Sequence, residues 1–123
     1  MTTAEIAKQL VELCRKGENA KAMELFYSPD IVSVEAVAMH GMPREAHGLA
    51  AVHKKSEWWV SNHTIHSASA SGPFVAVDKF AAVFDYDVTF KPTGQRRKMS
   101  EVAVYTLKNG KIVHEEFLYS AAM

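Results

Sequence analysis

Residues 101–119, EVAVYTLKNGKIVHEEFLY, decide the fold, because they predict two long strands joined by a tight turn. The Asn-Gly pair at 109–110 is the strongest short signal for a two-residue hairpin loop. We expect one strand over residues 97–107 and the last strand over residues 111–120. A two-residue loop then determines which residues of the two strands face each other.

The preceding segment also alternates between apolar and polar residues. We expect a strand over residues 64–71, a turn at residues 72–73 (Gly-Pro) and a second strand over residues 74–90. Residues 92–94, Pro-Thr-Gly, then predict the hairpin loop that leads into the strand at 97–107. Strands longer than the usual five or six residues favour a strongly twisted, curved sheet.

The first half of the chain predicts three helices. Thr2 and Glu5 have the spacing of a capping box, and Gly17 is a stop signal for the first helix. A second helix ends at Ser-Pro-Asp 28–30. The third, over residues 48–62, has an apolar face with Lys54, Lys55 and Glu57 on its opposite side.

The order of these elements predicts one α+β domain over residues 1–123. Residues 31–34 are β-branched enough for a short strand, and residues 39–47, with a glycine and a proline, indicate a loop. We therefore expect three N-terminal helices packed on a curved, mostly antiparallel sheet.

Composition excludes several classes of function. The 14 basic and 14 acidic residues cancel, so nothing in the charge points to nucleic acid. The single cysteine, Cys14, rules out an internal disulfide and sits at an apolar helical position. No stretch approaches the roughly 18 apolar residues of a membrane span, and the N-terminus predicts a capped helix rather than a signal peptide. We expect a soluble, cytoplasmic protein without membrane partners.

With the helices in this order, residues 101–119 resemble the final hairpin of the SnoaL-like, or nuclear transport factor 2-like, superfamily. Trp58-Trp59 followed by Asn62-His63 is similar to the end of that family's third helix. The resemblance covers essentially the whole chain and implies a cone-shaped, cystatin-like fold with a pocket at its open end. It also implies a homodimer formed through the outer face of the sheet. The superfamily includes polyketide cyclases, ketosteroid isomerases, epoxide hydrolases, dehydratases and proteins that only bind other proteins.

Glu115 is the foremost candidate for chemistry. The two-residue loop places it opposite Val104, on a face that it shares with Phe117 and other apolar residues. A lone carboxylate on an apolar face is costly to bury, so its pKa would be raised, as a general acid or base requires. The alternative is a salt bridge to an arginine or a lysine.

Two further carboxylates are weaker candidates. The same register places Glu101 on the other, outer face, which we favour, although a β-bulge in the last strands would bring it to the pocket. Asp85 and Asp87 alternate with aromatic residues and favour a solvated face. Asp85 stays a candidate because isomerases and epoxide hydrolases of the resembled fold place acids on their long strands.

Histidines lie where the third helix gives way to strand. His63 and His66 make a metal site conceivable, but His-x-x-His without a third ligand is a weak signal, and we expect no metal. His66 is a candidate acid, base or hydrogen-bond donor in the pocket. Tyr27 is a candidate donor to a ligand carbonyl, or it simply ends the second helix.

A mostly apolar lining with few polar groups is usual for a small-molecule site. The residues expected to form it are Met39, Met42, Trp59, Phe74, Phe117 and Tyr119, with Tyr27. Two hypotheses follow. One is cofactor-independent acid/base catalysis, of isomerase, cyclase or hydrolase type, on a hydrophobic carbonyl compound. The other is a non-catalytic domain that binds an apolar ligand or another protein.

Overall fold

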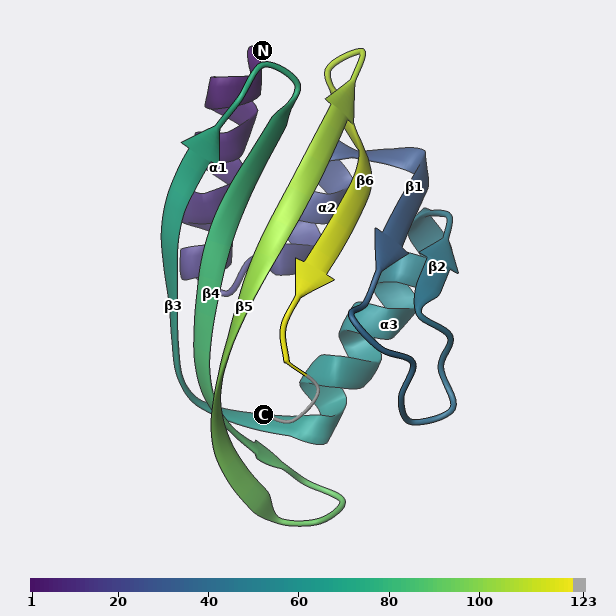
Figure 1. Ribbon diagram of the computed structural model, residues 1–123, viewed down its shortest axis with the longest axis vertical. Coiled ribbons are helices and arrows are strands. Elements are labelled where there is room, and N and C mark those ends of the chain that lie inside the picture. The colour runs from purple at the N-terminus through teal and green to yellow at the C-terminus, as the bar shows by residue number, and fades with distance from the viewer. Residues whose placement is uncertain (121–123) are drawn as a thin grey trace.

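Within residues 1–120, which the structure describes, three helices cover one face of a curved six-stranded sheet (Figure 1). The structure is a computed structural model. The helices are α1 (Thr3–Arg15), α2 (Asn19–Phe26) and α3 (Leu49–Asn62). The strands are β1 (Tyr27–Val34), β2 (Glu45–His47), β3 (His63–Val75), β4 (Lys79–Phe90), β5 (Gln95–Lys108) and β6 (Lys111–Leu118). The predicted α+β architecture is confirmed.

The sheet is mixed, with the order β2-β1-β6-β5-β4-β3. Its strands pair antiparallel except for β1 and β6, which run parallel. That single parallel pair brings the strand after the first two helices next to the last strand of the chain. Residues around position 33 therefore meet residues around position 115, a long-range contact with no signal in either local sequence.

Local signals explain where α1 begins. The Thr2 hydroxyl accepts a hydrogen bond from the Glu5 backbone N–H at 3.1 Å, and the Glu5 carboxylate accepts one from the Thr2 N–H at 3.0 Å. This is the predicted capping box. The helix then buries one apolar face, whose members include Ile6, Leu10 and Val11.

One predicted turn is wrong. Gly72-Pro73 does not separate two strands but lies inside β3, where the pairing with β4 is irregular. The chain reverses after Val75 instead, and the Ala76 N–H donates to the Lys79 carbonyl at 2.7 Å. Irregular pairing absorbs an X-Pro step that lacks a backbone donor, so β3 passes through it.

A second correction concerns the register of the last hairpin. Leu107 pairs with Ile112 as predicted, but Thr106 pairs with His114, so Val113 is an extra residue in a β-bulge. The bulge shifts all later pairs by one position. Glu115 therefore lies opposite Tyr105, not Val104.

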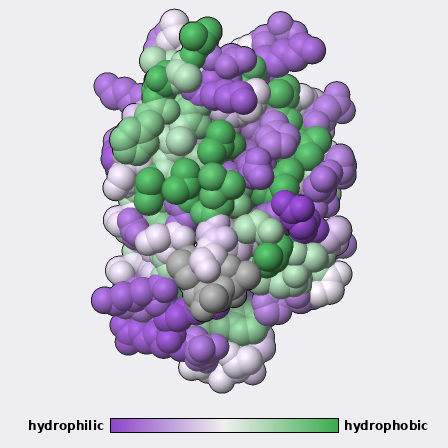
Figure 2. All heavy atoms as spheres, in the orientation of Figure 1, coloured by the Kyte–Doolittle hydropathy of each residue, from purple (hydrophilic) through white to green (hydrophobic). Residues whose placement is uncertain are grey.

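Because of the bulge, Glu115 and Phe117 share the inner face of the sheet with Glu101, Ala103 and Tyr105. The inner face packs against the helices and carries the core, in which Phe80 stacks on Tyr105 with ring centroids 4.7 Å apart. Apolar residues also gather near the middle of the opposite, outer face (Figure 2). Among residues 1–120, no helix is long and apolar enough to cross a membrane.

Candidate functional site

Two adjoining hollows lie between the inner face of the sheet and α3. The large hollow has a volume of about 280 Å³ and the small hollow about 110 Å³. Four side chains line both of them: Glu35, Lys55, Trp59 and Glu101. We refer to the two hollows together as the cavity.

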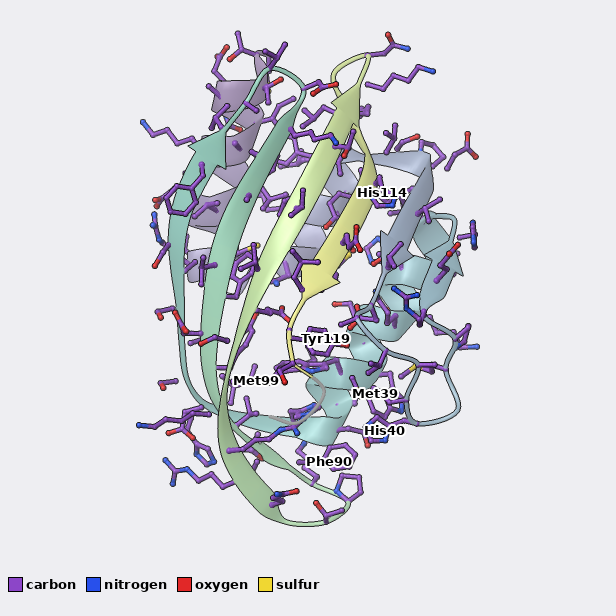
Figure 3. The ribbon with its side chains drawn as sticks, in the orientation of Figure 1. Met39, His40, Phe90, Met99, His114 and Tyr119 are labelled. Atoms are coloured by element: carbon purple, nitrogen blue, oxygen red, sulfur yellow. The ribbon has the colours of Figure 1, made fainter. Side chains whose placement is uncertain are left out.

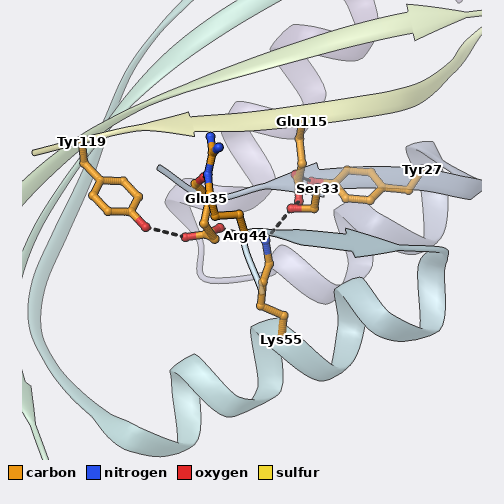
Figure 4. Close-up of polar contacts among 7 residues, drawn as sticks. All are labelled: Tyr27, Ser33, Glu35, Arg44, Lys55, Glu115 and Tyr119. Atoms are coloured by element: carbon orange, nitrogen blue, oxygen red, sulfur yellow. Dashed lines mark hydrogen bonds and ion pairs between the residues drawn. The ribbon is translucent and has the colours of Figure 1, made fainter. Parts of the chain in front are cut away.

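Glu115 lies on the wall of the large hollow, and both of its carboxyl oxygens accept hydrogen bonds. The residue is 2% exposed. Its Oε1 accepts a hydrogen bond from the Ser33 hydroxyl at 2.8 Å, and its Oε2 accepts one from the Tyr27 hydroxyl (Figure 4). Burial raises the pKa of Glu115, and the bonds from Tyr27 and Ser33 act against that rise. No arginine or lysine pairs with it directly within residues 1–120.

The hydrogen bonds continue from Ser33 along the cavity wall. The Lys55 ammonium group donates to the Ser33 hydroxyl and, at 2.8 Å, to Oε2 of Glu35. The Tyr119 hydroxyl donates to Oε1 of the same carboxylate at 3.0 Å (Figure 4). A continuous polar chain therefore runs from Tyr27 through Glu115 to Tyr119.

Glu101 differs from these carboxylates, because it makes no hydrogen bond or ion pair to any of residues 1–120. It lies opposite Phe84 on β4, partly buried, and borders both hollows. Burial raises the pKa of Glu101 to about 8, with the nearby carboxyl groups of Glu35 and Glu115 acting in the same direction and Lys55 against it. A carboxyl group in these surroundings holds a proton near neutral pH and can exchange it.

The small hollow has an aromatic wall. His40 packs between Trp58 and Phe90, with centroid distances of 5.1 and 5.0 Å, and Trp59 stacks on His63 at 4.3 Å. Figure 3 shows His40 and Phe90 next to each other, with Met39 just above His40 and Tyr119 above them. Partial burial lowers the pKa of His63, whose Nδ1 lies 2.8 Å from the Trp59 carbonyl. The neutral imidazole therefore forms part of an apolar wall.

Most of the predicted lining residues reach the cavity. The large hollow is lined by Tyr27 and Phe117, the small one by Met39, Met42 and Tyr119, and both by Trp59. Phe74 does not, and that prediction is corrected. It pairs with Ala81 on the outer face and is 60% exposed, because β3 continues through Gly72-Pro73.

Two other candidates lie away from the cavity. His66 is exposed, and its Nε2 lies 2.7 Å from the Thr89 hydroxyl. Asp85 accepts a hydrogen bond from the Ser100 hydroxyl on the outer face of the sheet. His63 and His66 therefore do not converge, and residues 1–120 contain no group of three potential metal ligands from histidine, cysteine and acidic side chains.

Sequence reasoning missed three members of the polar chain. Ser33 and Glu35 lie two and four residues after the buried Ile31, and this period-two spacing could have placed them on the same inner face, but their partner strand was not predictable locally. Lys55 was expected on the exposed side of its helix. Its side chain is only 19% exposed, because the long aliphatic stem lets the ammonium group reach the cavity. Glu101 was expected on the outer face unless a β-bulge occurred in the last strands. That bulge is present, and Glu101 lines the cavity.

A curved sheet whose inner face borders a cavity places the protein in the class of small α+β proteins with a cone-shaped fold. Comparisons with known proteins identify its family within that class. The model of the SnoaL-like domain family matches residues 1–119. The chain belongs to this family. No curated protein matches it.

Solved structures agree with this assignment. A Mesorhizobium loti protein, provisionally named a SnoaL-like polyketide cyclase with carbohydrate phosphatase in brackets, is 50% identical, with a TM-score of 0.90 over 97% of this chain and 100% of that one. A Bacillus subtilis protein, provisionally named an isomerase, is 19% identical, with a TM-score of 0.75 over 98% and 87%. A nuclear transport factor 2-like protein of unknown function from Burkholderia pseudomallei is 17% identical, with a TM-score of 0.78 over 98% and 92%. The last two show the fold alone.

Proposed function

We propose that the protein binds a hydrophobic, carbonyl-bearing small molecule in the cavity and moves a proton on it, with Glu101 as the acid/base group. The observation that carries the proposal is the Glu101 carboxyl group itself. It borders both hollows without a hydrogen bond to residues 1–120, in a cavity whose other walls are largely apolar and aromatic. Such a group is available to a ligand.

Glu115, the foremost candidate from the sequence, has a supporting role in this proposal. Both of its oxygens already accept hydrogen bonds, from Tyr27 and Ser33. Because Glu115 is only 2% exposed, a ligand that took the place of one of these donors would leave a buried polar group unpaired, at a cost of about 1–3 kcal/mol. The Tyr27 hydroxyl likewise donates its hydrogen bond to Glu115, so it does not donate to a ligand.

The chemistry follows from the surroundings of Glu101. A general acid or base works best when its pKa lies near the working pH, and burial holds the pKa of Glu101 at about 8. The carboxylate form takes a proton from the carbon beside the carbonyl group, and the acid form returns it to another atom. The 50% identical relative named as a SnoaL-like polyketide cyclase agrees with proton transfer of this kind, and the step requires no cofactor.

Hydrogen–deuterium exchange tests the proposal. The protein is incubated in D₂O with a panel of apolar 1,3-diketones and cyclic ketones, and deuterium beside the carbonyl is followed by NMR. We expect wild-type protein to accelerate exchange for some members of the panel and Glu101→Gln to lose that acceleration. Glu116→Gln is the matched control, because Glu116 pairs with Val104 on the outer face.

The result also separates the two hypotheses from the sequence. If a compound binds but wild-type protein does not accelerate exchange on any member of the panel, the domain binds ligands without catalysis. If Glu101→Gln exchanges as fast as wild type, Glu101 is not the acid/base group.

We also propose that the outer face of the sheet forms a homodimer. Val102 and Val104 pair with Leu118 and Glu116 on that face, and Leu118 is 48% exposed. Figure 2 shows apolar surface there. Contiguous exposed apolar surface commonly marks an interface. Light scattering after size-exclusion chromatography should give twice the 13.6 kDa chain mass, and Leu118→Asp should shift it toward one chain.

A further inference from the structure

Lys55 is the cation of the polar chain that borders both hollows. Its ammonium group has three N–H donors. Two of them bond to Ser33 and Glu35, and within residues 1–120 the third makes no hydrogen bond. The nitrogen also lies 5.2 Å from the centre of the Phe117 ring, on the wall of the large hollow.

The charges around this nitrogen leave room for a further anion. Glu35 is its ion-pair partner at 2.8 Å. Burial raises the pKa of Glu101 to about 8, so its neutral form predominates near pH 7, and Glu115, whose pKa burial also raises, makes no direct ion pair with Lys55 within residues 1–120. Tyr27 and Tyr119 contribute neutral hydroxyl groups. The positive charge of Lys55 is therefore opposed mainly by one carboxylate, in a partly desolvated site where an extra negative oxygen is strongly attracted.

We propose that Lys55 binds the oxygen of the ligand and holds the negative charge that develops on it. The ligand class is then an enolisable ketone or a phenol: one acidic oxygen on an apolar body. This inference rests on the proposed function, because it adds the oxygen-binding group to the site where Glu101 moves the proton.

The step balances without any other reactant. The Glu101 carboxylate takes a proton from the carbon next to the carbonyl group, and the electrons of the C–H bond form the C=C bond of an enolate. The carbonyl oxygen becomes negative and accepts the third N–H of Lys55. A donor already in place where charge develops speeds such a reaction by about 10²–10³-fold. When neutral Glu101 returns the proton, the enolate charge is removed.

A purely structural Lys55, serving only to close the chain between Ser33 and Glu35, is the competing explanation. The two differ in the ionisation state of a bound acidic oxygen. 4-Nitrophenol is a suitable probe, because it has one acidic oxygen on an aromatic ring and ionises near neutral pH, where Glu101 holds its proton. Its anion absorbs at longer wavelength than the neutral form. Absorbance titrations of the bound and free probe measure the difference directly.

We expect 4-nitrophenol to ionise about one pH unit lower, or to be about tenfold more acidic, on wild-type protein than in buffer. Lys55→Met should abolish this shift, and Lys55→Arg, which keeps the charge and the Glu35 pair, should retain most of it. Lys54→Met is the matched control, because Lys54 is an exposed residue of the same helix. Circular dichroism of each variant checks that α3 and the sheet are intact.

Each outcome is decisive. If the probe binds in its neutral form to wild type and to Lys55→Met alike, the inference about Lys55 is wrong while the apolar cavity of the proposed function stands. If Lys54→Met loses the shift as Lys55→Met does, the effect is general surface charge and the inference also fails. If folded wild-type protein does not bind 4-nitrophenol at all, the proposed function fails and Lys55 loses its role with it.

Discussion

The stability of the protein should fall as the pH rises from about 5 to about 8, because the fold prefers the neutral form of Glu101. The pKa of this carboxyl group is raised from 4.5 to about 8 by burial and by two neighbouring carboxyl groups. A group with a raised pKa binds its proton more tightly in the folded state. Its stabilisation is therefore complete below the unfolded value of 4.5 and is lost as the pH rises through about 8.

The size of the effect follows from the proton count. In this window the folded state holds one more proton than the unfolded chain at Glu101, so the free energy of unfolding falls by about 1.4 kcal/mol per pH unit. Between about pH 5 and pH 7 the loss is about 2–3 kcal/mol, a substantial part of the 5–15 kcal/mol stability of a typical domain. Glu115, whose pKa is also raised, acts in the same direction.

Urea denaturation at a series of pH values measures this slope. Glu101→Gln carries no titrating group, so its unfolding free energy should fall less steeply than that of wild type, and the variant should be the more stable protein near pH 8. His63 acts in the opposite direction, because burial lowers its pKa and stability is gained as the pH rises through its titration. That contribution is common to both proteins and cancels in the difference between them.

Equal slopes for wild type and Glu101→Gln would refute the reasoning. The carboxyl group would then be solvated in the fold, and its assignment as the acid/base group would fail with it. Glu116→Gln, with the substitution on the outer face of β6, controls for the loss of one carboxylate anywhere on the sheet.

Three further predictions concern the elements that build the site. Thr2→Ala removes the capping box of α1 and should lower the unfolding free energy by about 1 kcal/mol in urea; an unchanged midpoint would contradict the cap. Tyr27→Phe leaves Oε2 of Glu115 without its donor and should cost about 1–3 kcal/mol, whereas a neutral result would mean that water replaces the hydroxyl group. Deleting the bulged Val113 should keep a cooperative fold at a cost of about 1–3 kcal/mol, because His114 then follows Ile112 in a regular ladder. Circular dichroism melts, which check this third prediction, should show a larger fall in melting temperature for deletion of Ala103 than for deletion of Val113, because loss of Ala103 would turn Glu101 to the outer face.

Local signals were sufficient for most of the architecture. The capping box of Thr2 and Glu5 and the Asn109-Gly110 turn depend on neighbours in the sequence, and both are found where they were predicted. The turn predicted at Gly72-Pro73 is not formed. The residues that favour a turn are also tolerated where strand pairing is irregular, and only the partner strand decides between a turn and a continued strand.

The site was less predictable, because it depends on one inserted residue and one parallel strand pair. Val113 has no feature that marks it as a bulge, yet it determines which face Glu101 and Glu115 occupy. Glu115 was selected as a lone carboxylate on an apolar face with Val104. It is buried on the opposite face, beside Tyr105 and Ser33. The correct residue was found with the wrong neighbours, so its hydrogen-bond donors were missed.

The distribution of charge in the cavity is itself an argument for function. A domain selected only for stability gains little from three carboxyl groups, Glu35, Glu101 and Glu115, around the single ammonium group of Lys55. Two of them have partners within the fold. Glu35 pairs with Lys55 and accepts a hydrogen bond from Tyr119, and Glu115 accepts hydrogen bonds from two hydroxyl groups. Glu101 has no such partner among residues 1–120. Its raised pKa means that ionising this side chain in the folded state costs free energy, and an apolar residue opposite Phe84 would carry no such cost. Departures from the most stable choice of residue concentrate where a protein performs chemistry, and in this cavity the departure is at Glu101.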